Sequence, residues 1–408
     1  LLGVGGGVVA AAGAATAIAL LSDRRGTATA GGGSGSPSPV VRPNGADVPE
    51  AKPSWQATQQ TPSPQVLAVD GVTVCVSVQH IWGLDDTGRT KWTVDGGAFA
   101  IDPNTPRPVA GTDAGRLVVA EWAGLKTDLL SLDPADGRVD WRFTRDQKNA
   151  TGVTSFAGVR SGKAYFLGSG DGQDRGLVPG GSHVWAVDLA ARRTAWFHGE
   201  DTLLVQSALL PDDDRVMISN LDQLKVLDAT GAVVWTRKLA ALGIAAAGGH
   251  FLAPDADGKL TALNPDDKGS TAWTADGVVG GSIRGGGFAG GEDGKLLHCL
   301  WKDADGGYSV GTLDPANGRN AWRTPLPPDS PEAKYLGARL LYADGNLYRM
   351  GADAVIWALD PANGAPRWKY SGLKGKDPVR LAWSAGAGRL CVSDTTTQTI
   401  TAVPAKGA

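Results

Sequence analysis

Two acidic turns are the segments of this chain whose residue types come closest to a metal site. Asp255–Gly258 and Asp303–Gly306 both have the sequence DADG and begin like a calcium-binding loop. Each lacks the third acidic position and the distal Glu that complete the oxygen cage around the ion. Asp-Gly is also a strong β-hairpin signal, so we predict that both segments are hairpin turns. The acidic run Asp212–Asp214 is interpreted in the same way, as a solvated turn.

A glycine-rich stretch offers a second chemistry, the binding of a nucleotide phosphate. Gly285, Gly287 and Gly290 have the spacing of dinucleotide and kinase glycine loops. No strand–helix–strand pattern surrounds them, and Ala289 and Leu296 stand where a Walker loop requires Gly and Ser or Thr. We therefore predict a turn between strands. The chain also contains no kinase catalytic-loop signature.

Histidines and cysteines are too scattered to predict a metal or redox site. The five histidines stand singly at positions 80, 183, 198, 250 and 298, and the three cysteines form no framework. Such residues can still converge in a repeat fold, so a metal site stays open at this point. Cys75 and Cys391 share a Cys-Val-Ser context, but equivalent positions in face-packed sheets lie about 10 Å apart, too far for a disulfide. We expect both to be buried as small hydrophobic side chains.

Composition indicates the kind of fold that positions these residues. The chain has 408 residues, of which 58 are glycines and 14 are tryptophans, and this combination indicates many tight turns around aromatic packing. The net charge of −3 gives no basic surface for nucleic acid.

One recurring pattern predicts the fold. A small residue is followed by a hydrophobic residue, an Asp, a turn that contains Gly, and a Trp four residues after that Gly. Copies of full length are Ser131–Trp141, Thr312–Trp322, Ala358–Trp368 and Ala186–Trp196, the last with Arg192 in place of the Gly; Gly83–Trp92 and Val226–Trp235 are one residue shorter, and Ala262–Trp273 is one longer. The tryptophans are 38 to 55 residues apart, a period typical of propellers and solenoids.

The segments between these copies are predicted to be β-strands. Hydrophobic residues alternate at period two, for example in Thr73–Val78 and Arg116–Trp122. Each unit therefore predicts four short antiparallel strands, which make one propeller blade. After the last full unit only three strands follow, and we predict that a strand at Trp55 completes their blade. The fold class predicted is an all-β, eight-bladed propeller, because seven blades would leave three strands with exposed edges.

The residues before the repeats predict a membrane segment and a tether. Residues 1–21 carry no charge and are long enough to cross a hydrocarbon core of about 30 Å as a helix. A signal-peptide core with a cleavage site at Ala28–Ala30 is the alternative. Residues 22–54 are rich in Gly, Ser, Pro and Ala and are predicted to be a disordered linker, which leaves 55–408 for the propeller. Because the sequence opens with Leu1, we expect it to be a fragment of a longer chain.

The repeat resembles the tryptophan-docking motif of the PQQ-like, quinoprotein-type propeller superfamily from Trp55 to the C-terminus. The resemblance implies that each Trp stacks between blades, against the small first residue and the Gly turn of a neighbouring repeat, and only small residues let an indole approach the backbone so closely. The implied docking residues are Trp55, Trp92, Trp141, Trp196, Trp235, Trp273, Trp322, Trp368, Gly88, Gly137, Gly231, Gly269, Gly318 and Gly364. Arg192 and the unequal turns are expected to loosen docking in blades three to five.

Membership of this superfamily does not imply a bound quinone. The quinone dehydrogenases that the chain resembles are longer and have a calcium site, a catalytic Asp and usually an adjacent cysteine pair, which this chain lacks. We expect no cofactor, no metal ion and no catalysis within this sequence. Two non-enzymatic branches fit better, the outer-membrane-assembly lipoprotein of the BamB type and the extracytoplasmic propeller of actinobacterial transmembrane Ser/Thr kinases.

The layout of residues 1–54 resembles the kinase branch. We predict a non-catalytic sensor propeller outside the cell membrane, anchored by the N-terminal helix, with any kinase activity upstream of Leu1. It would bind a protein or a small molecule at the propeller face. An assembly scaffold of the BamB type is the first alternative, and a quinoprotein dehydrogenase is the second. The longest insertion, Ser169–Ser182, suits either ligand binding or plain mobility.

Overall fold

Short runs of alternating hydrophobic residues, separated by glycine turns, form antiparallel strands that the computed structural model groups into eight sheets. The structure describes residues 42–407 except 60, 63–64, 78, 96–97, 100–109, 114, 124–125, 145–152, 170–181, 203, 205, 211–212, 221, 242, 256, 280–287, 291–295, 328–338 and 352. The chain divides after Val41, and Arg42–Ala408 form the unit described below.

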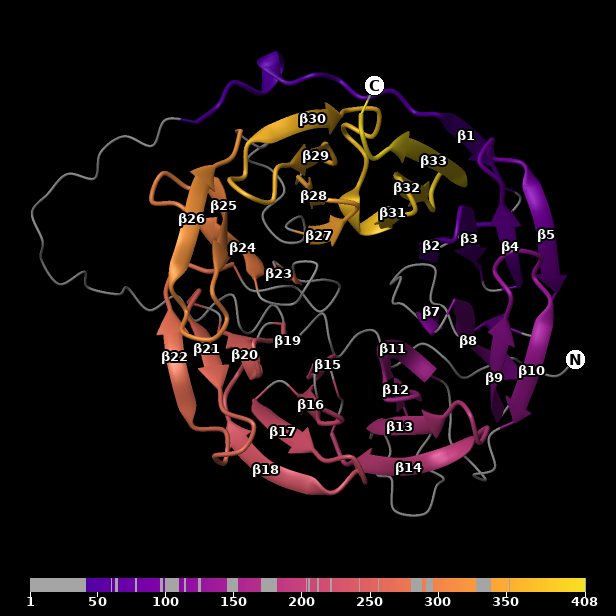
Figure 1. The fold of residues 1–408 in the computed structure, drawn as a ribbon, viewed down its shortest axis with the longest axis vertical. Coiled ribbons are helices and arrows are strands. Elements are labelled where there is room, and N and C mark those ends of the chain that lie inside the picture. The colour runs from indigo at the N-terminus through magenta and orange to yellow at the C-terminus, as the bar shows by residue number, and fades with distance from the viewer. Residues whose placement is uncertain are drawn as a thin grey trace, which may run out of the picture. The chain divides into compact units, whose positions relative to one another are not determined.

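Each sheet is one blade, and its strands pair in chain order from the centre of the ring outwards (Figure 1). Blade one contains β2 (Gln65–Val69), β3 (Val72–Val76), β4 (His80–Leu84) and β5 (Thr90–Asp95). Blade two contains β7 (Ala110–Asp113), β8 (Arg116–Ala123), β9 (Lys126–Leu132) and β10 (Val139–Thr144), with β6 (Ala98–Phe99) also paired to β8. Blade three contains β11 (Val153–Arg160), β12 (Lys163–Ser169), β13 (Ser182–Asp188) and β14 (Arg193–Glu200).

The next three blades repeat this arrangement. Blade four contains β15 (Gln206–Leu209), β16 (Val216–Ser219), β17 (Gln223–Leu227) and β18 (Val233–Lys238). Blade five contains β19 (Ala245–Ala247), β20 (His250–Pro254), β21 (Leu260–Leu263) and β22 (Thr271–Ala275). Blade six contains β23 (Phe288–Gly290), β24 (Leu297–Lys302), β25 (Tyr308–Leu313) and β26 (Asn320–Pro325).

The last two blades close the ring. Blade seven contains β27 (Arg339–Ala343), β28 (Asn346–Met350), β29 (Ile356–Leu359) and β30 (Pro366–Tyr370). Blade eight contains β31 (Leu381–Gly386), β32 (Arg389–Asp394) and β33 (Thr399–Pro404), and β1 (Trp55–Thr58) pairs with β33 as its outer strand. The predicted eight-bladed fold and its closure by the Trp55 strand are confirmed.

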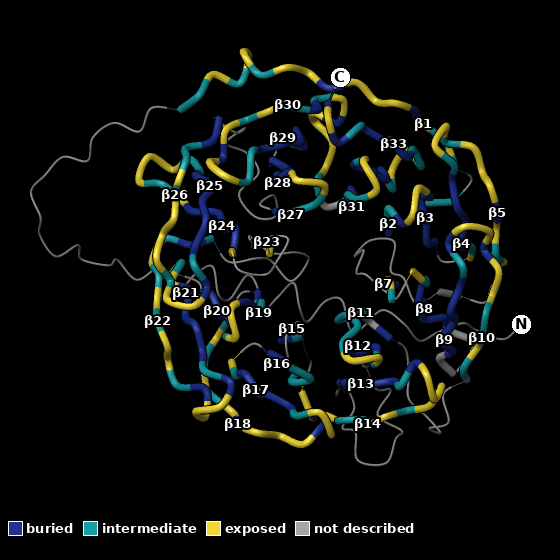
Figure 2. Tube along the Cα trace, in the orientation of Figure 1, coloured by how far each residue is buried: buried dark blue, intermediate teal, exposed yellow. Residues whose placement is uncertain are grey.

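Burial follows the position of a strand within its blade (Figure 2). Middle strands such as β16 and β28 are buried at every residue, whereas the outer strand β5 is buried only at Trp92. The middle strands are covered on both faces by the neighbouring blades, so their hydrophobic residues run on without alternation. In the outer strands, only the residues that contact the next blade are buried.

Part of the region before β1 differs from its prediction. Residues 1–41, which include the predicted membrane helix and most of the predicted linker, lie outside the described residues. Residues 42–54, assigned above to the linker, lie against the blades, and Ala51 among them is buried. The helices in the described part are η1 (Gly45–Asp47) and η2 (Pro378–Arg380), and neither could cross a bilayer.

Ring closure gives a first prediction. The amide of Gln59 donates to the carbonyl of Gln398, so along this antiparallel pair the amide of Ala57, paired with Ile400, also points at β33. Ala57→Pro removes that hydrogen bond and leaves a buried carbonyl unpaired, and we expect it to lower the free energy of unfolding by about 2 kcal/mol. Thr58→Pro is the control, because its amide points away from β33, and it should cost less than half as much. Equal losses in urea denaturation would contradict this closure.

Candidate functional site

The predicted docking residues meet between blades. Seven outer-strand indoles lie over a glycine turn of the following blade, so close that a Cβ on the glycine would come within 2.5–2.9 Å of the ring. The pairs are Trp55 with Gly88, Trp92 with Gly137, Trp196 with Gly231, Trp235 with Gly269, Trp273 with Gly318, Trp322 with Gly364 and Trp368 with Gly407. Each of these glycines also has a positive φ, from 69° to 84°. Space and backbone conformation therefore both require Gly at these turns.

Two details of the docking differ from the expectation. We expected the small first residue of the repeat to contact the Trp of a neighbouring blade. It is instead the cross-strand partner of the Trp in its own blade, as Ala358 is of Trp368. Arg192, which replaces the docking glycine, keeps the left-handed backbone with φ 54°. Its guanidinium lies 5.8 Å from the centre of the Trp141 ring. At this turn, where we expected looser docking, the indole thus has a cation–π contact in place of the contact with glycine.

The indole N–H has a hydrogen-bond partner at three of the longer turns and none at the two shorter ones. Trp92, Trp235 and Trp273 each donate to a proline carbonyl 2.9 Å away in the following turn, which in all three copies begins Asp-Pro or Asn-Pro. Trp55 and Trp196 face the shorter Asp-x-Thr-Gly turns, and their buried indole nitrogens have no hydrogen-bond partner in the described part of the chain.

A second contact, which the sequence analysis missed, comes from the residue two positions after the Trp. His198 Nδ1 lies 3.0 Å from the carbonyl of Gly231, Arg237 donates to the carbonyl of Gly269, and Thr324 donates to the carbonyl of Asn363. Side chains two apart on a strand share a face, so these groups point at the same turn as the indole. The signal available in the sequence was a polar residue at that position.

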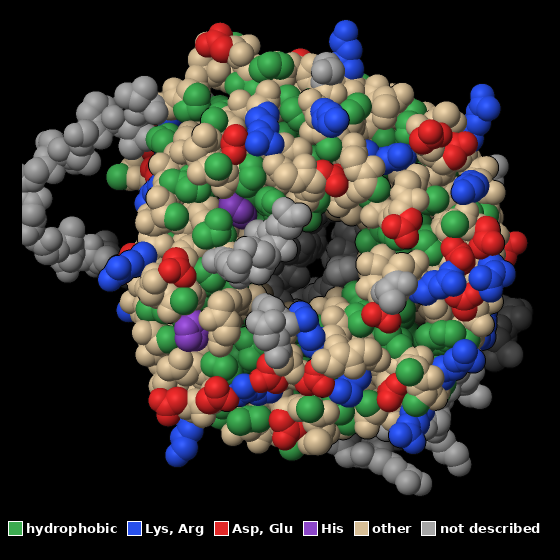
Figure 3. Space-filling view, in the orientation of Figure 1, with side chains coloured by type: hydrophobic (Ala, Val, Ile, Leu, Met, Phe, Trp, Pro, Cys, Tyr) green, Lys and Arg blue, Asp and Glu red, His purple; other side chains and the backbone are tan. Residues whose placement is uncertain are grey.

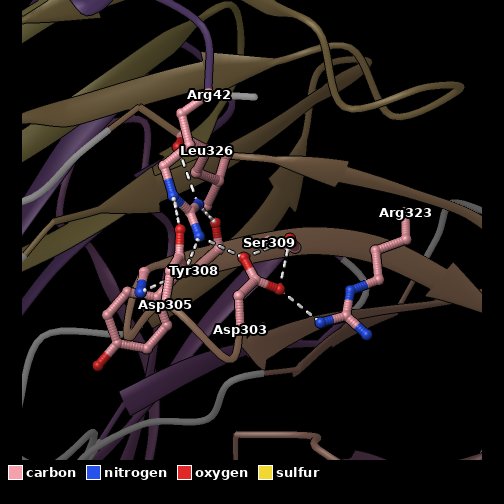
Figure 4. Close-up of polar contacts among 8 residues, drawn as sticks. Arg42, Asp303, Asp305, Tyr308, Ser309, Arg323 and Leu326 are labelled. Atoms are coloured by element: carbon pink, nitrogen blue, oxygen red, sulfur yellow. Dashed lines mark hydrogen bonds and ion pairs between the residues drawn. The ribbon is translucent and has the colours of Figure 1, made fainter. Parts of the chain in front are cut away.

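The two acidic DADG turns have different environments. Asp255 Oδ1 accepts hydrogen bonds from the amides of Asp257 and Lys259, so this segment is the predicted hairpin turn between β20 and β21. The turn at Asp303 and Asp305 also joins two strands, β24 and β25, but its carboxylates bind the Arg42 guanidinium at 2.6–3.1 Å (Figure 4). Neither turn presents the oxygen cage that calcium needs.

Two carboxylates of this fold, Glu200 and Asp214, are paired with lysines of a neighbouring blade. Glu200 is almost fully buried, and its oxygens lie 2.7 Å from His198 Nε2 and 2.6 Å from Lys225 Nζ in blade four. Burial alone raises the pKa of Glu200, but the hydrogen bonds from His198 and Lys225 outweigh it and hold the pKa below its usual range. Asp214, predicted to be part of a solvated turn, pairs instead with Lys163 at 2.7 Å.

Histidines and cysteines do not converge. The described residues contain no group of three or more His, Cys, Asp or Glu side chains that could hold a metal ion. All three cysteines are free and buried, as expected for Cys75 and Cys391. His298 is buried, and its Nδ1 lies 2.8 Å from Thr312 Oγ1.

Two sequence features fall largely outside the described residues. The glycine motif at Gly285 and Gly287 is one of them, and only its last residue, Gly290, is described, at the end of β23. The insertion at residues 170–181 is the other.

Docking gives a second prediction. Gly137 and Gly162 have φ 74° and 70°, but a Cβ at Gly137 would lie 2.5 Å from the Trp92 ring, whereas one at Gly162 meets nothing within 4 Å. Gly162→Ala should cost about 1 kcal/mol of unfolding free energy for the left-handed backbone alone. Gly137→Ala should cost about 3 kcal/mol, because the indole must also move. Comparable losses for both variants in chemical denaturation would mean that the turn carries no docking contact.

Burial of His298 gives a third prediction. Burial lowers the pKa of His298 to about 4. A folded-state pKa below the unfolded value means that folding favours the neutral imidazole, so stability is lost as the pH falls from about 6.5 towards 4. We expect a loss of about 2 kcal/mol between pH 7 and pH 5. His298→Gln should flatten this profile, and an unchanged profile for His298→Gln would contradict the assignment.

Comparison with known proteins agrees with this geometry. A family model described as "Outer membrane protein assembly factor BamB" matches residues 175–284 and 269–403. No curated protein matches the chain. Among solved structures, BamB from Moraxella catarrhalis is 15% identical with a TM-score of 0.54, and the match covers 87% of this chain and 99% of that one.

Two further solved structures share the fold. Sqt1 of Saccharomyces cerevisiae is 8% identical with a TM-score of 0.59 over 87% of this chain and 99% of that one. Quinohemoprotein alcohol dehydrogenase ADHIIG from Pseudomonas putida HK5 is 12% identical with a TM-score of 0.53 over 90% of this chain and 78% of that one. These identities establish the fold alone. The family match spans more than half of the sequence, and with the Trp–Gly repeats it shows that this chain is a PQQ-like β-propeller that belongs to the BamB family.

Proposed function

We propose that this propeller is a non-catalytic platform that binds a protein partner on the extracytoplasmic side of a membrane, to which its N-terminal segment attaches it. The description of its family as an outer membrane protein assembly factor supports a role in binding proteins. The apolar run at residues 1–21 supports the attachment.

The observation that carries this proposal is that charged side chains form ion pairs with other blades and with the segment before β1. Asp303 and Asp305, in one of the two turns that begin like a calcium loop, hold Arg42, and Glu200 holds Lys225 of the next blade. These groups tie blades and segments together, so their chemistry gives a rigid ring. A calcium-dependent quinone site does not fit at Asp303, because its carboxylate is already bonded to two guanidiniums.

The surface favours recognition by shape and local contacts over a strong field. The net charge is −3, and Figure 3 shows acidic and basic side chains interspersed over one face around a central hollow. A surface of mixed sign does not steer a partner from a distance. Specificity then rests with the turns at the two ends of the blades.

A second candidate is the sensor region of a receptor Ser/Thr kinase, favoured by the layout of residues 1–54. An apolar segment followed by a Gly, Ser and Pro-rich stretch is expected between a kinase and an outer domain. Kinase glycine-loop and catalytic-loop motifs upstream of Leu1 would support the receptor. A short basic stretch that ends in a lipobox cysteine would support the assembly scaffold.

Site-directed crosslinking in native membranes tests the platform. A photoreactive residue is placed at one of four exposed positions. Asp257 and Thr396 lie in turns between the second and third strands of their blades, and Ala135 and Ala229 lie in turns between the third and fourth strands. Because strands alternate in direction, the two pairs lie at opposite ends of the blades. We expect both members of one pair to give the same protein adduct and the other pair to give none.

The competing enzyme is tested on the same full-length chain. With PQQ and calcium we expect neither saturable binding nor dye reduction. Quinone-dependent turnover, or adducts that are absent from all four positions, would overturn the proposed function.

A further inference from the structure

Residues 42–54, which we call the strap, follow the outer edges of blades six and seven before they become β1. Arg42 contacts the β24–β25 turn of blade six, and Gly45 accepts a hydrogen bond of 2.6 Å from Lys369 on β30. The amide of Ala51 then donates to the carbonyl of Lys369 at 2.7 Å, and the amide of Ser54 donates to that of Ala402 in blade eight at 2.8 Å. One segment thus contacts three consecutive blades.

The Arg42 guanidinium is fully bonded in its site (Figure 4). Its Nε and one Nη donate to Asp305, and the same Nη donates to Asp303. The other Nη donates to the carbonyls of Tyr308 and Leu326 at 2.5 and 3.2 Å. These contacts use all the N–H groups that a guanidinium offers, in a planar fork that the ammonium of a lysine cannot reproduce.

The turn itself is shaped around this side chain. A Cβ at Gly307 would lie 2.2 Å from the Arg42 guanidinium carbon, so only glycine leaves room for it. Asp303 is held in turn by Ser309 and by Arg323 from β26. The Asp303 carboxylate is therefore held in place by two groups besides Arg42.

The rest of the strap covers apolar surface and a strand edge. A Cβ at Gly45 would lie 2.9 Å from the Trp357 ring, and Val48 packs on the cluster that contains Leu326 and Trp357. Glu50 forms a parallel bridge with Lys369 and accepts hydrogen bonds from the amide and hydroxyl of Ser371. The strap thus makes one parallel bridge to the outer edge of β30, and backbone pairing at a sheet edge is a common way for a sheet to bind an extended peptide.

We propose that this surface, formed by Asp303, Asp305, Leu326, Trp357 and Lys369 and called the strap site, is a binding site for an extended peptide segment led by an arginine, which this chain fills with its own residues 42–51. Arg42 is the group that selects the occupant, and Val48 and Ala51 supply the small apolar contacts. The strap closes the ring a second time beside β1.

The experiment frees the site and refills it. In the full-length chain, Arg42→Glu places a carboxylate against Asp303 and Asp305, and release of the strap is read as faster hydrogen exchange at the Ala51 amide, by at least tenfold. A fluorescent peptide with the sequence of residues 42–51, RPNGADVPEA, is then titrated against this variant and against the wild-type chain. The same peptide with Lys in place of its Arg is the matched ligand. Arg319→Glu is the control chain, because it makes the same change of charge at an exposed arginine on another turn of blade six.

We expect the Arg peptide to bind Arg42→Glu at least tenfold more tightly than it binds wild type or Arg319→Glu. The Lys peptide should bind at least tenfold more weakly than the Arg peptide. A further Asp305→Asn change, in an exposed turn, should abolish the preference for Arg. Unchanged exchange at Ala51 in Arg42→Glu, equal binding of the two peptides, or no gain over wild type would each overturn the proposal. None of these results depends on whether crosslinking identifies a partner, so the two proposals fail separately.

Discussion

The ring depends on the contact between an indole and a turn that has no side chain. Neighbouring blades face each other as packed sheets, so few backbone hydrogen bonds join them, and side chains must hold the ring together. At the glycine turns a broad indole lies where a Cβ would stand, and the same residues have a positive φ, as at Gly137 and Gly318. Both demands fall on one residue, which explains why glycine recurs there, and the turn with Arg192 meets its indole through a guanidinium instead.

The fold was predictable because each blade needs the same residues at the same positions, so the pattern recurs along the sequence. The period of the tryptophans and the three strands left after Trp368 were sufficient for the number of blades and for closure by Trp55. The contacts of the residue two positions after the Trp were not predictable, because their partners are carbonyls in the next blade, as for His198 and Gly231. At Arg192 the sequence predicted a looser contact, since a missing glycine is visible but a guanidinium folded onto Trp141 is not.

The strap was missed for a different reason. Residues 42–54 have the composition of a linker, and composition averages over residues, whereas the docking of this segment depends on one guanidinium and a few backbone groups. The partners of Arg42 lie 261 to 284 residues away, and two of them are carbonyls, which carry no signal in a sequence. The DADG turn at Asp303 was predicted as a hairpin turn, which it is, but its two carboxylates also bind a guanidinium from outside the turn, and the turn pattern gives no sign of that.

Closing the ring also determines where a partner can act. An outer strand presents unpaired backbone groups, and natural sheets cover or blunt such edges. Blade eight has β1 at its edge, and blade seven has the strap beside β30, so the seam of the ring is covered twice. Buried carboxylates such as Glu200 and Asp303 join blades or hold the strap, and the tryptophans of the repeat are engaged in docking. What remains for recognition is the set of turns at the two ends of the blades, which the repeat does not constrain, and function in this fold therefore varies there while the ring stays the same.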